Sequence, residues 1–351
     1  MRFAFAQLIR NSLVSRTSGH GSPEATGVGM APCEPSATAP SEKAPVPSPE
    51  QPLLPPDKEA VLLEALKAAF PHGRLGCDDW RPIVEAELRN RQYWFKYRYI
   101  PWMNSVLPLN GARVLEIGAG TGSSTIPLLE CGAYVTSIDI SDVDLQIAEL
   151  RARLHGLADR VAFHQINAAD IGLSFQGGSF DLIVYLASLE HMTYQERLAS
   201  LRSAWSLLPS GRFLGVCDTP NRLWYYDEHT ALQHFFHWLP DEVALDYARR
   251  TPRPKFNEDF LARHADSATR LQRWGRCVSY HEFEVALDLN VRDLEVYGEW
   301  QYRRERDDPQ WWAEVWMKSK DGTFHSFLKS VAPQLPLAFI EPELAFMMRK
   351  P

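Results

Sequence analysis

The sequence has no long apolar run and no paired cysteines. No apolar stretch reaches the roughly 18 residues that a membrane-spanning helix needs, so we expect no membrane span. The cysteines are scattered, odd in number and without a C-x-x-C pair: Cys33, Cys77, Cys131, Cys217 and Cys277. This spacing predicts neither a zinc site nor a disulfide framework, and it fits a reduced, cytoplasmic protein.

An excess of positive charge is also missing. Acidic side chains outnumber basic ones, and the formal net charge is −7. Because the phosphate backbone of DNA and RNA attracts basic surfaces, we do not expect nucleic acid as the main substrate. Hydrophobic residues make up 45% of the chain, which is enough for a sizeable core.

The first 56 residues differ in character from the rest. Arg2, Arg10 and Arg16 precede the first acidic residue, as in presequences that direct proteins to organelles. A loose bacterial N-terminus or a misassigned start fits equally well. Residues 18–56 hold ten of the 25 prolines and are rich in Ser, Ala and Gly. We expect this segment to be disordered and without chemistry, because it has little apolar surface to bury.

The most informative stretch is RVLEIGAGTGSSTIPLLECGAYVTSIDIS, residues 113–141. It predicts a buried strand, a turn with glycines at Gly118, Gly120 and Gly122, a helix, and a second strand that ends at Asp139. Glycines let a ligand approach bare backbone, and the helix directs free N–H groups toward it. An acid about 20 residues after such a turn is where a ribose is held. The stretch therefore predicts a site for a nucleoside cofactor.

The position of the third glycine distinguishes between cofactors. A dinucleotide turn, G-x-G-x-x-G, has glycine in the sixth position, where this chain has Ser123. The spacing E-x-G-x-G-x-G, which begins at Glu116, resembles motif I of the class I S-adenosylmethionine-dependent methyltransferases. The resemblance implies S-adenosyl-L-methionine as the cofactor, and the Glu116 carboxylate suits its ammonium group.

The resemblance continues through NAAD at 167–170, FDLIV at 180–184, LEH at 189–191 and LLPSG at 207–211. Similar methyltransferases read the adenine edge with an Asp-Ala pair after the third strand, where this chain has Asn167-Ala168, and Asp170 is a competing candidate. The cofactor-binding residues that the resemblance implies are Glu116, Gly118, Ala119, Gly120, Gly122, Asp139, Ile140, Asn167, Ala168 and Arg91.

Strands and helices alternate along the central part of the chain. We expect strands at 114–117, 134–139, 161–166, 180–186 and 212–217, with helices at 145–154 and 194–208. Such alternation predicts a parallel sheet covered on both faces, with ligands at the carboxyl ends of its strands. The resemblance implies an α/β, Rossmann-like methyltransferase fold with a mostly parallel seven-stranded sheet and a helical insertion.

The chain divides into five segments by composition and motif. After the N-terminal segment 1–56 we expect a helical cap at 57–108, with a helix from Asp57 that stops before Pro71 and a second from near Pro82. In similar methyltransferases such helices close over the cofactor, and Arg91, Tyr93 or Arg98 is a candidate for its carboxylate. The core spans 109–221, an aromatic-rich substrate or lid insertion 222–290, and strands at 294–302 and 344–349 complete the sheet within 291–351.

The acceptor side of the site is less well defined by sequence. Methyl transfer is a direct displacement, so the protein mainly positions an acceptor, and a hydroxyl acceptor also needs a general base. His191 is the first candidate, because a strand delivers it to the ligand-binding edge and histidine titrates near neutral pH. Glu190 orients it or lines the site. Candidates in the insertion are His229 and also Asp227, His234 and His237. No residue spacing indicates a metal, so we expect none.

These observations favour a methyltransferase that acts on a small-molecule or glycan- or lipid-linked acceptor, with oxygen as the target atom. A catalytically silent scaffold that binds the cofactor is the main alternative. Methylation of protein side chains and an NAD-type oxidoreductase on the same sheet are weaker ones. The oligomeric state and the identity of the acceptor are left open by the sequence.

Overall fold

The computed structural model describes residues 51–70, 86–262, 264–307 and 309–351. All described residues fall in one compact unit, Pro49–Pro351. Within these ranges no helix is both long enough and apolar enough to cross a bilayer. The expectations for the first 50 residues, and for a helix start near Pro82, lie outside the described residues.

One seven-stranded sheet organises the fold, with the strand order β3-β2-β1-β4-β5-β7-β6. The strands from β3 to β5 pair in parallel, and β7 runs antiparallel to both of its neighbours. The sequence direction reverses between β1 and β4, which is where ligands bind in open α/β sheets. The predicted mostly parallel, Rossmann-like sheet is confirmed.

The strands lie where the sequence predicted them, with ends that differ by a few residues. Their bounds are β1 Arg113–Ile117, β2 Tyr134–Asp139, β3 Val161–Gln165, β4 Leu182–Leu186, β5 Phe213–Pro220, β6 Glu295–Gly298 and β7 Glu343–Arg349. The central strand β4 is buried along its whole length. Its continuous apolar run is what a strand covered on both faces requires.

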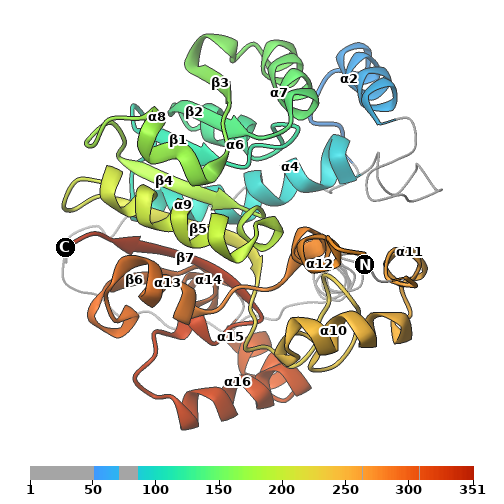
Figure 1. Ribbon diagram of the computed structural model, residues 1–351. Helices are drawn as coiled ribbons and strands as arrows, with labels where there is room; N and C mark the ends of the chain where they lie inside the picture. The colour runs from blue at the N-terminus through green and yellow to red at the C-terminus, as the bar shows by residue number, and fades with distance from the viewer. Residues whose placement is uncertain (1–50, 71–85, 263, 308) are drawn as a thin grey trace, which may run out of the picture. The chain divides into compact units, whose positions relative to one another are not determined.

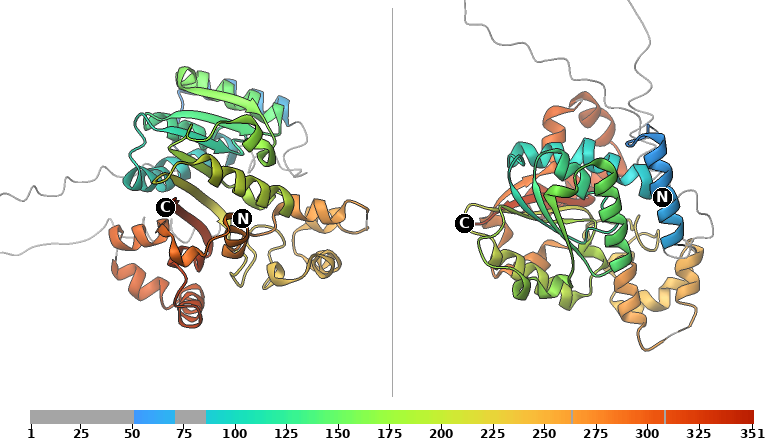
Figure 2. Two further views of the ribbon diagram at one scale, coloured as in Figure 1. Left: turned by 60° about the vertical axis from the view of Figure 1, so that its left-hand side comes forward. Right: turned by 90° about the horizontal axis from the view of Figure 1, so that it is seen from above.

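Alternate side chains of the strands feed two separate cores, one on each face. On one face Leu115 and Ile183 pack with α8 (Ile171–Ser174), α9 (Tyr194–Leu207) and α13 (Tyr280–Leu287). On the other, Val114 and Val184 pack with α5 (Ile100–Val106), α6 (Thr125–Glu130) and α7 (Asp142–His155). The sheet lies between these groups of helices in Figure 1 and in both views of Figure 2.

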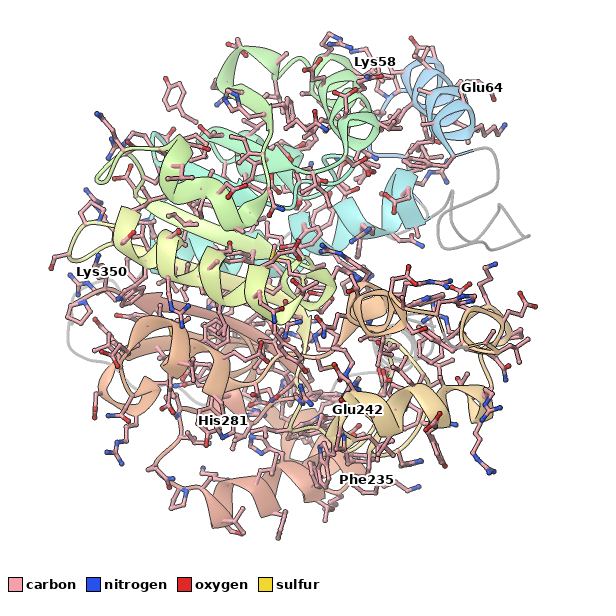
Figure 3. All side chains as sticks on the ribbon, in the orientation of Figure 1. Lys58, Glu64, Phe235, Glu242, His281 and Lys350 are labelled. Atoms are coloured by element: carbon pink, nitrogen blue, oxygen red, sulfur yellow. The ribbon has the colours of Figure 1, made fainter. Side chains whose placement is uncertain are left out.

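The helical cap consists of α2 (Pro56–Ala69) and one continuous helical stretch, residues 86–106. In that stretch the π-helical turns η2 (Ala86–Asn90) and η3 (Phe95–Tyr99) alternate with α4 (Arg91–Trp94) and α5. Helix α2 packs on α7 through Leu62 and Ile147, and Lys58 donates to the carbonyl of Leu154 at 2.8 Å (Figure 3). The π-helical turns are of interest because such turns often lie at functional sites.

The insertion after β5 builds a core of its own. This core lies among α10 (Asp241–Tyr247), α11 (Pro254–Asp259) and α12 (Ser267–Gly275), whereas α13 of the same segment packs on the sheet core. Phe236, Phe256 and Trp274 are buried together between them, whereas Phe235 and Glu242 are exposed and are labelled in Figure 3. Much of the aromatic content of this segment therefore serves packing.

The prediction for the C-terminal segment was partly wrong. The strand expected at 294–302 ends at Gly298, and helices follow before β7: α14 (Glu299–Arg306), α15 (Pro309–Trp311), the π-helical turn η10 (Trp312–Trp316) and α16 (Lys320–Val331). Trp300, Trp312 and Trp316 pack against one another with ring centroids 5.5–5.8 Å apart. Trp312 and Trp316 are four residues apart, which places them on one side of a helix, where they pack against Trp300 of α14.

Short 3-10 turns connect the larger elements. They are η4 (Ala158–Arg160), η5 (Ala168–Asp170), η6 (Leu189–His191), η7 (Phe236–Trp238), η8 (Ala248–Arg250), η9 (Val291–Asp293) and η11 (Leu337–Phe339). Of these, η5 and η6 follow β3 and β4 directly. They set the backbone at the carboxyl edge of the sheet, where the sequence places the site.

Candidate functional site

The three glycines of the turn after β1 have left-handed backbones, with φ of +82° at Gly118, +52° at Gly120 and +80° at Gly122. A Cβ on Gly118 would lie 2.4 Å from the Cβ of Ser188, and one on Gly122 would lie 3.0 Å from Ala148. A Cβ on Gly120 would meet nothing within 4 Å. Two glycines therefore allow close packing, and the third presents bare backbone to open space.

Asp139, at the end of β2, connects the turn to the next loop. Its carboxylate accepts hydrogen bonds from the backbone N–H groups of Gly120 and Ser141, both at 2.9 Å. These bonds fix the carboxylate at the rim of the turn while the side chain stays half-buried. Ile140 follows with 56% of its surface exposed and offers an apolar face to a flat ring.

Asn167 and Ala168 lie at the end of β3, as expected for residues near an adenine. The Asn167 side-chain oxygen accepts the backbone N–H of Ala169 at 2.9 Å and so caps η5. Its second lone pair and its amide group can still serve a ligand, because an amide carbonyl accepts two hydrogen bonds. Ala168 is buried and Asp170 is exposed. The roles of these residues stay predictions.

Glu116 does not face a ligand. Its side chain is completely buried, and its two oxygens accept hydroxyl hydrogen bonds from Ser124, Thr125 and Ser137. Burial raises its pKa, and these three bonds oppose that rise. The expectation that Glu116 holds an ammonium group is corrected. It lies beneath the turn and ties β1 to β2 and to the start of α6.

The helical cap contacts the turn directly. Glu87 accepts from the Thr121 hydroxyl at 2.8 Å and from Arg91 at 3.1 Å. The fully buried Arg151, from α7, donates to the carbonyl of Thr121 at 2.8 Å and to that of Glu87 at 2.6 Å. Arg151 therefore fixes the cap against the glycine turn.

Arg91 is the cap residue best placed for an anionic group. Its guanidinium is bound on one side by Glu87, and its Nε is buried with no hydrogen-bond partner among the described residues. A buried, unsatisfied donor beside the turn fits the carboxylate of a bound S-adenosylmethionine. Arg98 is ruled out for that task, because it pairs with Glu299 at 3.0 Å and also with Glu343.

His191 ends η6, directly after β4. Its Nδ1 lies 3.0 Å from the carbonyl oxygen of Arg273, whose guanidinium donates in return to the carbonyl of His191 at 3.1 Å. Its Nε2 lies 3.8 Å from Oε1 of Glu190, which is completely buried. Since a carbonyl only accepts hydrogen bonds, Nδ1 carries a proton, and in the neutral ring Nε2 carries the lone pair.

His229 comes from the insertion and meets His191 across the site, with ring centroids 5.1 Å apart. One ligand atom from each of Glu190, His191 and His229 lies within 4.8 Å of the other two. The structure thus brings together the three residues that the sequence proposed for catalysis, although their roles stay predictions.

Of the other candidates in the insertion, two support the turn that presents His229. Asp227 is completely buried and accepts the backbone N–H groups of His229 at 2.9 Å and of Thr230 at 2.6 Å. His237, also buried, lies 3.2 Å from Asp227. Burial would raise the pKa of Asp227, but His237 and the backbone hydrogen bonds of Thr230 and Ala231 lower it below its usual value. His234 is exposed and stacks on Tyr225.

Backbone strain marks the same edge of the sheet. Ala187, immediately after β4, has φ of +55°, and Asp218, near the end of β5, has φ of +53°. Left-handed backbones are costly for residues other than glycine and cluster at functional sites. The strained residues flank η6, which carries Glu190 and His191.

Comparison with known proteins identifies the class. Residues 114–211 match the family model of a methyltransferase domain. The ubiquinone biosynthesis O-methyltransferase of Nitrosococcus oceani is 38% identical over 86 residues, which are 24% of this chain and 35% of that protein. An uncharacterised protein of Synechococcus sp. is 39% identical over 159 residues, which are 44% of this chain and 36% of that protein.

A solved structure, the magnesium protoporphyrin IX methyltransferase of Synechocystis with its bound cofactor, is 24% identical. The match covers 51% of this chain and 83% of that one, with a TM-score of 0.35. The chain spans less than half the length of the curated relatives above. Together with the strand order, the family match shows that the chain contains a class I S-adenosylmethionine-dependent methyltransferase domain. The predicted family and cofactor are confirmed.

Proposed function

We propose that the protein transfers the methyl group of S-adenosylmethionine to an oxygen atom of a small-molecule acceptor. One observation carries the proposal: the cofactor turn and the loop that bears His191 are in direct contact. The close approach of Gly118 to Ser188 leaves no room for a Cβ, and the Ser188 hydroxyl donates to the carbonyl of Ile117 at 2.8 Å. Three residues further along the chain is His191.

Each part of the site has a task in this reaction. When bound, S-adenosylmethionine supplies an electrophilic methyl group on a positively charged sulfur. Asp139 offers its carboxylate to the ribose, and Arg91 offers its unsatisfied Nε to the carboxylate of the cofactor. These contacts hold the cofactor in one orientation, which is the main contribution that a protein makes to a displacement reaction.

His191 accepts the proton of the acceptor hydroxyl. Its Nδ1 donates to the carbonyl of Arg273, so its Nε2 is the basic nitrogen. As that nitrogen gains a proton, the nearby Glu190 carboxylate stabilises the positive ring. A hydroxyl needs such a base near neutral pH, because its own ionisation is unfavourable there.

The choice of acceptor rests on supporting evidence of two kinds. Curated relatives of the core are named O-methyltransferases, which favours oxygen as the target atom. The insertion closes one side of the site with a folded helical unit, which favours a small acceptor over an exposed protein side chain. A glycan- or lipid-linked hydroxyl fits the same chemistry.

Turnover by the full-length protein tests the proposal. S-adenosylhomocysteine formation is followed by mass spectrometry with a panel of hydroxyl-bearing acceptors, in the wild type, His191→Ala and the control His281→Ala. His281 is exposed on α13 (Figure 3) and is not among the site residues described above. We expect His191→Ala to lower kcat by about 100-fold, the scale of general-base catalysis, with unchanged S-adenosylhomocysteine binding.

Equal rates in the wild type and His191→Ala would exclude His191 as the base. Cofactor binding without turnover of any acceptor would favour the catalytically silent scaffold.

A further inference from the structure

Three lone-pair donors converge at the carboxyl end of β4. They are the carboxylate of Glu190 and the imidazoles of His191 and His229, with one ligand atom of each within 4.8 Å of the others. Glu190 and His191 are neighbours in η6, whereas His229 belongs to the insertion. The sequence predicted no metal, because residues that meet only through the fold of the insertion leave no spacing motif.

Hydrogen bonding determines where the imidazole protons lie. His191 donates its Nδ1 proton to the carbonyl of Arg273. The Thr230 hydroxyl donates to the carbonyl of Gly275, so its oxygen accepts the Nδ1 proton of His229 at 3.3 Å. In both neutral rings the lone pair is therefore on Nε2.

Two imidazole nitrogens and a carboxylate oxygen share one small volume. A positive charge among these three groups, either a proton or a metal ion, is stabilised by all of them.

The supporting contacts resemble those that orient metal ligands. A ligating histidine usually donates its other ring N–H to a carbonyl or carboxylate, as His191 does to Arg273. The His229 backbone is fixed by Asp227 at 2.9 Å. Its ring packs where a Cβ on Gly275 would lie 2.4 Å away, so only glycine fits there. These contacts orient both rings through Nδ1, through the backbone and through packing.

We propose that Glu190, His191 and His229 bind one divalent transition-metal ion. Two imidazoles and one carboxylate form a ligand set that suits Zn²⁺, Co²⁺ or Fe²⁺ and leaves coordination positions open. Ligands at about 2.1 Å from a tetrahedral ion lie ~3.4 Å apart. The observed 3.8 Å between His191 Nε2 and Glu190 Oε1, and the limit of 4.8 Å for the whole set, require contractions of up to about 1.4 Å to reach that spacing. The His191 side chain is 38% exposed, so the open side is accessible.

The role of the ion rests on the proposed function, although its binding does not. The acceptor hydroxyl takes an open coordination position and releases its proton to water, because the ion lowers its pKa. The resulting oxygen anion forms the new bond to the methyl carbon. The carbon–sulfur bond breaks, and its electron pair stays on sulfur. With the ion bound, Nε2 of His191 is a ligand, so the ion takes over the task of activating the hydroxyl that the proposed function gives to His191 in the metal-free site.

Cobalt titration of the full-length, tag-free, chelator-treated protein tests the site. Co²⁺ with nitrogen and oxygen ligands in a site of low coordination number absorbs visible light, and the titration gives the stoichiometry. We expect one Co²⁺ per chain. His191→Ala and His229→Ala should each weaken Co²⁺ binding by about 100-fold or more, because substitution of a residue that only supports a ligand already costs about 10–100-fold in metal affinity. The exposed His234→Ala is the matched control and keeps full binding.

Two further measurements separate this site from a competing one and from the cofactor site. The buried thiol of Cys277 lies 2.9 Å from His237 and is the competing metal ligand nearby. Cys277→Ser should leave the spectrum unchanged. Loss of binding in this variant, no Co²⁺ absorption in the wild type, or equal absorption in His229→Ala would each overturn the proposal.

S-adenosylhomocysteine binding is measured on the same metal-free samples. Cofactor binding without Co²⁺ binding refutes the metal site and leaves the proposed function intact. Co²⁺ binding without cofactor binding refutes the proposed function and leaves the metal site intact.

Discussion

At the scale of single residues, buried polar groups hold the backbone of the site in place. Glu116 is held by three hydroxyls beneath the turn, and Asp227 caps the turn that presents His229. Both are acids that sequence reasoning placed against a ligand or an acceptor. Buried carboxylates persist only with such hydrogen bonds. Arg91 differs, because its Nε is unsatisfied among the residues described.

The Arg91 side chain is predicted to hold the amino-acid end of the cofactor. Arg91→Ala should weaken the binding of S-adenosylhomocysteine by about 10–100-fold, which is the cost of losing a hydrogen bond to a charged group. It should leave 5′-methylthioadenosine, which lacks that end, unaffected. Calorimetric titration of both ligands measures the two effects.

Arg89→Ala is the matched control, since Arg89 pairs with Glu59 on α2. If Arg91→Ala weakens the binding of both ligands equally, Arg91 supports the turn and does not contact the cofactor.

The sequence predicted the glycine turn, Asp139 and the position of η6, because local spacing alone determines them. It did not predict the burial of Glu116, whose hydroxyl partners come from both α6 and β2. Nor did it predict the buried contacts of Arg151 with the cap and the turn. The sequence pattern that could have indicated its burial is an arginine on the apolar side of α7. The meeting of His229 with His191 depends on how the insertion folds, which no local pattern encodes.

At the scale of elements, a chain of hydrogen bonds attaches the helical cap to α7. Arg151 donates to Gln92 at 3.1 Å, and the Gln92 amide lies 3.4 Å from Nε2 of His155. The amide nitrogen can donate only to an unprotonated ring. Burial first, and then the charge of Arg151, lower the pKa of His155 to about 4. The contact of the cap with α7 therefore favours neutral His155.

Acid should weaken this attachment. The unfolded chain has a histidine pKa near 6.5, so between that pH and about 4 it binds more protons than the folded protein, and stability falls as the pH falls. The loss is at most about 3 kcal/mol, and less where water reaches the half-buried ring.

His155→Gln should flatten this dependence. Urea unfolding at pH 7 and pH 4.5 measures it, with the exposed His164→Gln as control. Parallel curves for the wild type and His155→Gln would contradict the account.

At the scale of the whole molecule, distant segments of the chain converge on one edge of the sheet. Arg98 of the cap pairs with Glu299 of α14 and Glu343 of β7, and Glu299 is completely buried. Helix α13 packs on α9 over one face, and the insertion supplies His229. The methyltransferase match covers only residues 114–211. The cap, the insertion and the C-terminal helices lie outside that match.

Cofactor binding by the full-length protein tests the central claim most directly. S-adenosylhomocysteine is titrated calorimetrically into the wild type, Asp139→Ala, Asp139→Asn and the control Asp142→Ala, which removes an exposed acid one turn away. We expect micromolar binding in the wild type and the control. Binding should weaken by about 100-fold in Asp139→Ala and by less in Asp139→Asn, which keeps one acceptor oxygen. No binding to the folded wild type, or equal binding in all four proteins, would contradict the assignment of this site to the cofactor.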